Sequence, residues 1–187
     1  YNAYSQTLTG ASGNTVVGKT AMGALHNTAT NSNYNVAIGE LAMGAAALSA
    51  ADYNVAVGYR AGDVVTTASG SVFLGADAGG TVTTGNMNIA VGYDAMNGGT
   101  TTGDNNIAIG VSALDAITSG ADNIAIGRDA LGASVAGNDN LAIGKEALKV
   151  FANASGNLNI AIGNNAMDSA NSNMSRNIAI GYSALNT

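Results

Sequence analysis

A nine-residue phrase, Asn-[Val/Ile]-Ala-[Ile/Val]-Gly-x-x-Ala-[Leu/Met], recurs ten times along the chain. Its clearest copies run over residues 106–114 and 123–131, and successive phrase glycines are 17 to 21 residues apart. A fixed period near 18 residues predicts a solenoid, in which each repeat forms one coil that stacks on its neighbour. The phrase glycines are Gly18, Gly39, Gly58, Gly75, Gly92, Gly110, Gly127, Gly144, Gly163 and Gly181.

We expect an all-β fold, a parallel β-solenoid of about ten coils that forms a rod on the order of 48 Å long. Residues 1–13 are predicted to form an irregular or partial N-terminal coil, and residues 14–187 the repeat array. The chain starts at Tyr1 and stops just after a phrase. Because solenoids usually carry caps over their end coils, we expect a fragment of a longer fibre.

Within one phrase, Ile107 and Ile109 are two residues apart, so they share one face of a strand while Ala108 lies on the other. A short strand ended by glycine is favoured over a helix for the phrase. The middle position is almost always alanine, which we interpret as a surface approached closely by a second chain. The predicted chain–chain interface consists of Ala37, Ala56, Ala90, Ala108, Ala125, Ala142, Ala161 and Ala179.

The phrase asparagines are expected to stack into a ladder of side-chain amides, as in other stacked β structures. The copy at Ser71 lacks the asparagine and also replaces the middle alanine with Phe73, so that coil should differ locally. The predicted ladder includes Asn14, Asn35, Asn54, Asn88, Asn106, Asn123, Asn140, Asn159 and Asn177.

Composition excludes several functions. The net charge is −6 and the basic residues are scattered, which argues against nucleic acid as a partner. The chain has no cysteine and a single histidine, His26, so zinc sites and histidine-dependent nucleophiles are not expected, nor is enzymatic activity. No apolar run approaches the roughly 20 residues that cross a bilayer, so membrane insertion is not expected.

The variable x-x pairs are predicted to face outward, where tyrosine and charged residues could contact a cell-surface glycan or protein. No cofactor is expected, although Asp104, Asp122 and Asp139 lie in oxygen-rich linkers that could hold Ca²⁺. Turn formation explains these aspartates more simply. The candidate surface contacts are Tyr59, Arg60, Tyr93, Asp94, Arg128, Asp129, Lys145, Glu146 and Tyr182.

The phrase resembles the head repeat of trimeric autotransporter adhesins, in which Asn-Ser-Val-Ala-Ile-Gly-x-x-Ser recurs. It is more similar still to the Asn-Thr-Ala-Ile-Gly-x-x-Ala-Leu repeat of phage tail fibres and related surface proteins. The resemblance covers residues 14–185, although the coils here are longer than in the adhesin heads. It implies a left-handed parallel β-roll, a parallel homotrimer and a location outside the cell, at a cell surface or in a virion.

The function that we expect is a structural and adhesive fibre segment that presents its loops to a cell surface. A chain that assembles end to end into a filament is compatible with the same pattern. An ice-binding solenoid would require rows of Thr-x-Thr on the strands, whereas threonine here gathers in linkers such as 81–84 and 100–102. An acyltransferase-like β-helix would require three hexapeptides per turn, and only one is seen.

Overall fold

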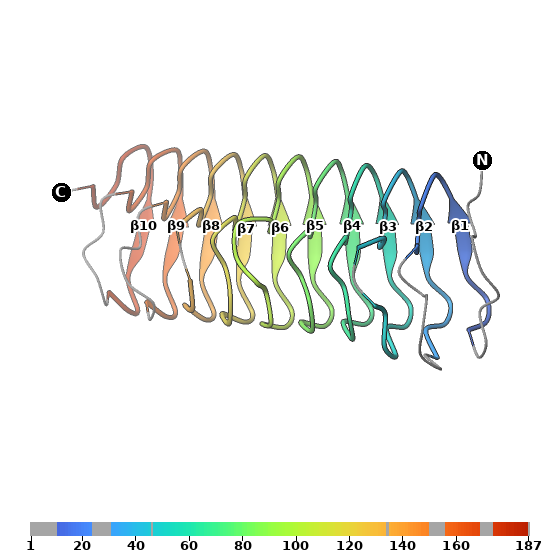
Figure 1. Cartoon of the computed structure of the whole chain (residues 1–187). Helices are drawn as coiled ribbons and strands as arrows, with labels where there is room; N and C mark the ends of the chain where they lie inside the picture. The colour runs from blue at the N-terminus through green and yellow to red at the C-terminus, as the bar shows by residue number, and fades with distance from the viewer. Residues whose placement is uncertain are drawn as a thin grey trace.

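The computed structural model describes residues 11–23, 31–45, 47–133, 135–149, 156–168 and 174–186. Each repeat contributes one three-residue strand, and all the strands pair in parallel, in chain order, in a single sheet (Figure 1). The strands are β1 (Thr15–Val17), β2 (Val36–Ile38), β3 (Val55–Val57), β4 (Val72–Leu74), β5 (Ile89–Val91), β6 (Ile107–Ile109), β7 (Ile124–Ile126), β8 (Leu141–Ile143), β9 (Ile160–Ile162) and β10 (Ile178–Ile180).

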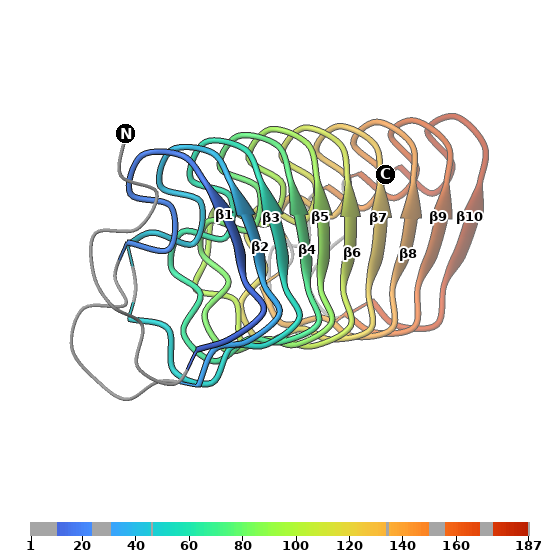
Figure 2. The same cartoon turned by 90° about the vertical axis from the view of Figure 1, so that its right-hand side faces the viewer.

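Turns complete each repeat, and the described residues contain no helix. Figure 2 shows the strands side by side along one wall of a rod, while the turns close the coils behind them. The register is constant, because each residue pairs with its equivalent one repeat later: Ala108 lies beside Ala125, for example. The prediction of an all-β parallel solenoid is therefore confirmed.

The middle strand residue points into the coil, and this overturns the predicted interface. Ala108 has no exposed surface, whereas its neighbour Ile109 is 39% exposed. The inward space is already filled within the same chain by Leu114 and Ile117, so only a small side chain fits there. The chain–chain interface predicted at Ala37, Ala56, Ala90, Ala108, Ala125, Ala142, Ala161 and Ala179 is wrong, because all of these side chains are buried inside their own chain.

The last residue of the phrase fills the centre of the coil, as its size predicts. Leu114, Leu131 and Met167 have no exposed surface, and each donates its backbone N–H to a carbonyl of the next repeat. Their backbone lies in the left-handed region, with φ of 51° at Leu114 and Leu131. Residues other than glycine rarely adopt this backbone conformation. Its recurrence shows that packing and inter-coil hydrogen bonds outweigh the local strain.

The asparagine ladder is present. In Asn123, the Oδ1 atom accepts the backbone N–H of Asn140 at 3.0 Å, and Nδ2 donates to Oδ1 of Asn106 at 3.0 Å. Nδ2 of Asn123 also donates to the buried carbonyl of Gly137 at 2.7 Å. Ser71 keeps part of the ladder, since its Oγ accepts the N–H of Asn88 at 3.1 Å.

Replacing Asn123 with alanine is expected to lower the free energy of unfolding by about 2–3 kcal/mol, because buried polar groups lose their partners. Asn123→Ser should cost roughly half as much, since a serine hydroxyl can still accept the N–H of the next coil, as Ser71 does. Urea unfolding of both variants at one protein concentration measures this. Equal losses of unfolding free energy for the two variants would show that the side-chain oxygen that accepts the N–H of the next coil does not stabilise the ladder.

Candidate interaction surface

The outward face of the sheet is a continuous apolar surface, which we call the outer face. It consists of the first and third residues of every strand, and among these strand residues only Thr15 is polar. Ile38, Leu74, Ile109 and Ile126 are all more than a third exposed. The outer face carries no charge from one end of the sheet to the other, and soluble chains rarely leave so long an apolar stripe uncovered.

Two columns of variable residues border the outer face. The leading rim is the residue just before each phrase asparagine, and every member of it is exposed: Gly13, Tyr34, Tyr53, Gly70, Met87, Asn105, Asp122, Asp139, Leu158 and Arg176. The trailing rim is the residue just after each phrase glycine, and all but the half-buried Ala76 are exposed: Lys19, Glu40, Tyr59, Ala76, Tyr93, Val111, Arg128, Lys145, Asn164 and Tyr182.

The predicted surface residues divide into two kinds. Tyr59, Tyr93, Arg128, Lys145 and Tyr182 belong to the trailing rim and are exposed, as predicted. The second residues of the same pairs begin the turn behind the rim. There Asp94, Asp129 and Glu146 are half-buried, whereas Arg60 is exposed.

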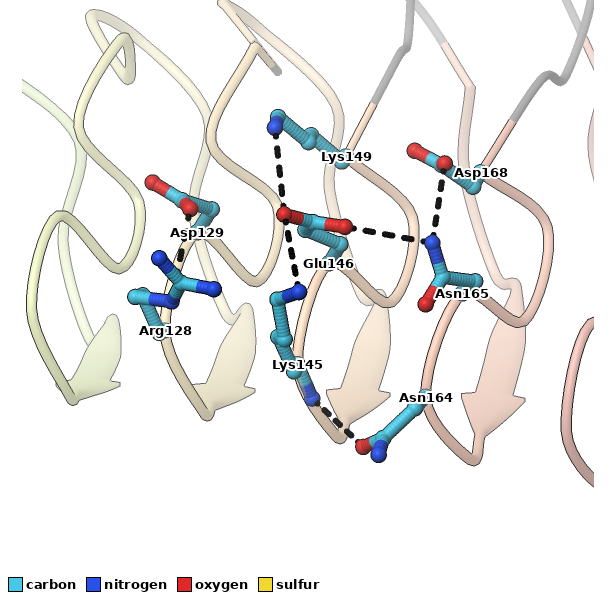
Figure 3. Close-up of polar contacts among 8 residues, drawn as sticks. All are labelled: Arg128, Asp129, Lys145, Glu146, Lys149, Asn164, Asn165 and Asp168. Carbon is cyan, nitrogen blue, oxygen red and sulfur yellow. Dashed lines mark hydrogen bonds and ion pairs between the residues drawn. The ribbon is translucent and has the colours of Figure 1, made fainter.

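Charged side chains of these pairs form ion pairs within single repeats (Figure 3). Glu146 lies between two lysines, with Oε1 at 3.6 Å from Nζ of Lys145 and 3.5 Å from Nζ of Lys149. It also accepts a hydrogen bond from Nδ2 of Asn165 at 3.1 Å. Partial desolvation raises the pKa of Glu146, but the two lysines and the amide outweigh it, so the net pKa is lowered. Exposed pairs of this kind stabilise little.

Arg60 forms a second group of ion pairs. Its Nε lies 3.1 Å from Oδ2 of the buried Asp63, and its Nη1 lies 3.4 Å from Oδ1 of Asp77. The hydrogen bond to Asp63 and the charge of that carboxylate raise the pKa of Arg60. Arg60 therefore neutralises a carboxylate that is buried in the coil. This role explains the presence of an arginine at residue 60 as well as a contact with an external partner would.

Asp115 lies close enough to the carboxylates of Asp94 and Asp129 to feel their charge. Its partial burial raises its pKa, and the charges of Asp94 and Asp129 raise it further. Because the folded protein disfavours the charged form, ionised Asp115 lowers stability at pH values above its raised folded pKa. The penalty disappears as the pH falls below the unfolded value of about 3.9, where the group is protonated in both states.

Asp115→Asn is therefore expected to raise the free energy of unfolding at pH 7 by about 0.5 kcal/mol, within the range of surface substitutions. At about pH 3 the variant and the wild type should be equally stable. Thermal unfolding of both proteins across this pH range measures the difference. A gain that persisted at pH 3 would show that the carboxylate charge is not its cause.

In the described residues, the linker aspartates included, no group of three or more histidine, cysteine, aspartate or glutamate side chains is placed to hold a metal. Asp104 instead accepts the backbone N–H of Asn86 at 2.6 Å. Equivalent bonds to side-chain oxygens run from Asn33 to Asp52 and from Asn138 to Asn157. This second polar ladder lies two residues before the phrase asparagine. It was not predicted, because the residue there varies among serine, asparagine and aspartate and is alanine at Ala121.

Two leading-rim tyrosines stack on each other. The rings of Tyr34 and Tyr53 are 5.2 Å apart and inclined by 8°. No ring contact is found for Tyr59, Tyr93 or Tyr182 in the described part of the chain. His26 lies outside the described residues.

No protein-family model, curated protein or solved structure matches this chain. No helix in the described ranges is long and apolar enough to cross a membrane. The outer face and its two rims are therefore the features on which a function must be argued.

Proposed function

We propose that this chain is a structural and adhesive segment of an extracellular fibre, such as a tail fibre or a surface adhesin, and that it is not an enzyme. In this proposal the roll is left-handed and assembles as a parallel homotrimer, and its loops present variable side chains to a glycan or protein on a cell surface. The observation that carries the proposal is the uncharged outer face, which runs the whole length of the sheet.

The outer face has the chemistry of an interface between chains. Its β-branched side chains are rigid and pack well against a second pleated surface. Complete burial of a fully exposed side chain of this size contributes roughly 1.5–3 kcal/mol, and a side chain such as Ile109, which is 39% exposed, would gain only the remaining fraction of this. A monomer would instead leave this stripe in water, with the hazard of uncontrolled aggregation.

The rod geometry suits a fibre. Backbone hydrogen bonds repeat from coil to coil, as in the 2.8 Å bonds from Ile107 N–H to the carbonyl of Asn123 and from Ile124 N–H to that of Asn140. Stability in such an array is a sum over neighbouring repeats, so the rod can be extended one repeat at a time. The variable residues lie at the rims and in the turns, where changes do not disturb the stack.

Two adjacent residues separate assembly from folding. Ile109→Asp places a charge on the outer face, so we expect the chain to stay folded but dissociate into monomers in sedimentation velocity. Ala108→Asp, the matched control, buries an unpaired charge inside the coil and should unfold the chain. A wild type that sediments as a monomer, or an Ile109→Asp variant that sediments like an assembled wild type, would contradict the proposal.

The adhesive part is tested by binding of the fluorescently labelled wild type to intact bacterial and animal cells. Several copies of one weak site give high avidity. The monomeric Ile109→Asp variant should therefore bind much more weakly than the wild type, although all its loops are unchanged. Absence of binding to every cell type would leave a structural segment without an adhesive role.

A further inference from the structure

The two rims carry opposite charges at the levels of β7 and β8. In the repeat of β7, the leading-rim residue is Asp122 and the trailing-rim residue is Arg128. In the repeat of β8, they are Asp139 and Lys145. All four side chains are exposed, so one rim is negative and the other positive at two consecutive levels of the rod.

The acidic residues of this pattern differ from the other rim charges in their ionic contacts. Among the described residues, no ion pair is formed by Asp122 or Asp139. Arg128 lies only loosely beside Asp129, at 4.0 Å, and Lys145 shares the carboxylate of Glu146 at 3.6 Å. The left-handed backbone at both aspartates, with φ of 59° and 56°, favours aspartate or asparagine. It does not explain why the opposite rim is basic at the same two levels.

We infer that the rims form the contact between neighbouring copies of this chain, with the leading rim of one copy against the trailing rim of the next, in parallel and at the same level. Asp122 then lies beside Arg128 of the neighbouring copy, and Asp139 beside its Lys145. This inference rests on the proposed assembly through the outer face and adds its register and the residues that meet.

The symmetry of a closed assembly determines the height along the rod at which the repeats of neighbouring copies meet. A closed ring of identical chains has its axis along the rod, so every repeat lies at the height of its equivalents. Since all copies face the axis, the leading rim of each chain meets the trailing rim of its neighbour. A shift by one repeat would build an open helix and not a closed ring.

Three uncharged levels, those of β3, β4 and β5, also match, whereas the levels of β6 and β9 pair an asparagine with an apolar residue. In the repeat of β3 the leading-rim Tyr53 would face Tyr59, and in the repeat of β5 Met87 would face Tyr93, which are contacts favoured by aromatic and thioether groups. In the repeat of β4, between them, both positions are small, Gly70 and Ala76. At these three levels, large side chains therefore meet large ones and small residues meet small ones.

An antiparallel pair would lose this match. Two outer faces related by a twofold axis across the rod place leading rim against leading rim and reverse the order of repeats. In such a pair that overlaps along its whole length, Asp122 would lie at the level of Gly70, and Asp139 at the level of Tyr53. Both carboxylates would approach uncharged groups, without the complementarity that selects orientation and partner.

Cysteine pairs test the register directly, because the chain has no cysteine of its own. The Asp122→Cys/Arg128→Cys double variant should form disulfides between chains on mild oxidation, giving covalent multimers on a non-reducing gel. Within one chain the two positions are separated by an extended strand, well beyond the roughly 7 Å that a disulfide permits between Cα atoms. The matched control, Asp122→Cys/Tyr93→Cys, is displaced by two repeats and should not cross-link.

Charge exchange gives an independent test. Asp122→Lys/Asp139→Lys sets like charges against each other at both levels and should weaken association at least about tenfold in sedimentation equilibrium. Adding Arg128→Asp/Lys145→Asp to the same chain should restore it. If the wild type associates but neither result is obtained, the register is wrong while the proposed assembly stands. A monomeric wild type would overturn both.

Discussion

Phe73→Ala is expected to lower the free energy of unfolding by about 3–5 kcal/mol, the usual cost of removing a buried phenylalanine. Phe73 takes the place of the middle alanine in β4 and has no exposed surface. Its ring fills space that leucine or methionine occupies in other repeats. The equivalent positions in its own and the preceding repeat are Gly79 and Gly62.

The surroundings of these glycines show that the Phe73 ring occupies the space of the side chains that they lack. A Cβ atom on Gly62 would lie 2.8 Å from Cδ2 of Phe73, and one on Gly79 would overlap with Cδ1 of the same ring. Both glycines have φ near 60°, close to the 51° of Leu114 at the equivalent corner. The backbone therefore already has the conformation in which other repeats hold a large side chain.

A compensating variant makes this prediction specific. Phe73→Ala/Gly79→Leu restores the common repeat at β4 and should recover much of the lost stability, whereas Gly79→Leu alone should destabilise because the ring blocks it. Urea unfolding of the three variants gives the coupling energy. A double variant no more stable than Phe73→Ala would show that the ring does not substitute for the missing leucine.

Gly110→Ala is expected to cause the second large loss in the free energy of unfolding. Gly110 has φ of 137°, a region nearly closed to side chains, and an added Cβ would lie 2.6 Å from the carbonyl oxygen of Gly127. Strain of this kind costs about 1–3 kcal/mol, and the clash with the next coil adds to it, so we expect a total loss above about 3 kcal/mol.

Gly181 provides a matched control. It has a similar φ of 125°, yet a Cβ there would have no atom within 4 Å. Gly181→Ala should therefore show the strain alone and unfold at a clearly higher urea concentration than Gly110→Ala. Equal losses for the two variants would mean that close approach between successive coils does not explain the phrase glycine.

The period of the phrase was enough to predict one strand per repeat, the parallel stack and the asparagine ladder, because each follows from local spacing. The period did not show which residues of the strand point into the coil. Ala108 and Ile109 alternate in the same way whichever side is inside, and hydrophobicity alone favours burying isoleucine. What decides the matter is the width of the coil, since Leu114 and Ile117 leave room only for alanine.

The surface residues show a similar division. Arg128 and Lys145 were predicted to be exposed from their variability, but their partners could not be found from sequence. The significance of Asp122 and Asp139 depends on their lying at the same level as these basic residues on the opposite rim of the outer face. The volume exchange among Phe73, Gly62 and Gly79 likewise depends on residues brought together only by stacking.

The most direct test is the mass and shape of the wild type in solution, from light scattering combined with small-angle X-ray scattering. The account predicts a particle of about 55 kDa, three times the chain mass of 18.3 kDa. Its length should match a single rod, because parallel chains at one level add width and not length. A particle with the mass of one chain would contradict the assembly through the outer face, and a trimer much longer than one rod would contradict the level register.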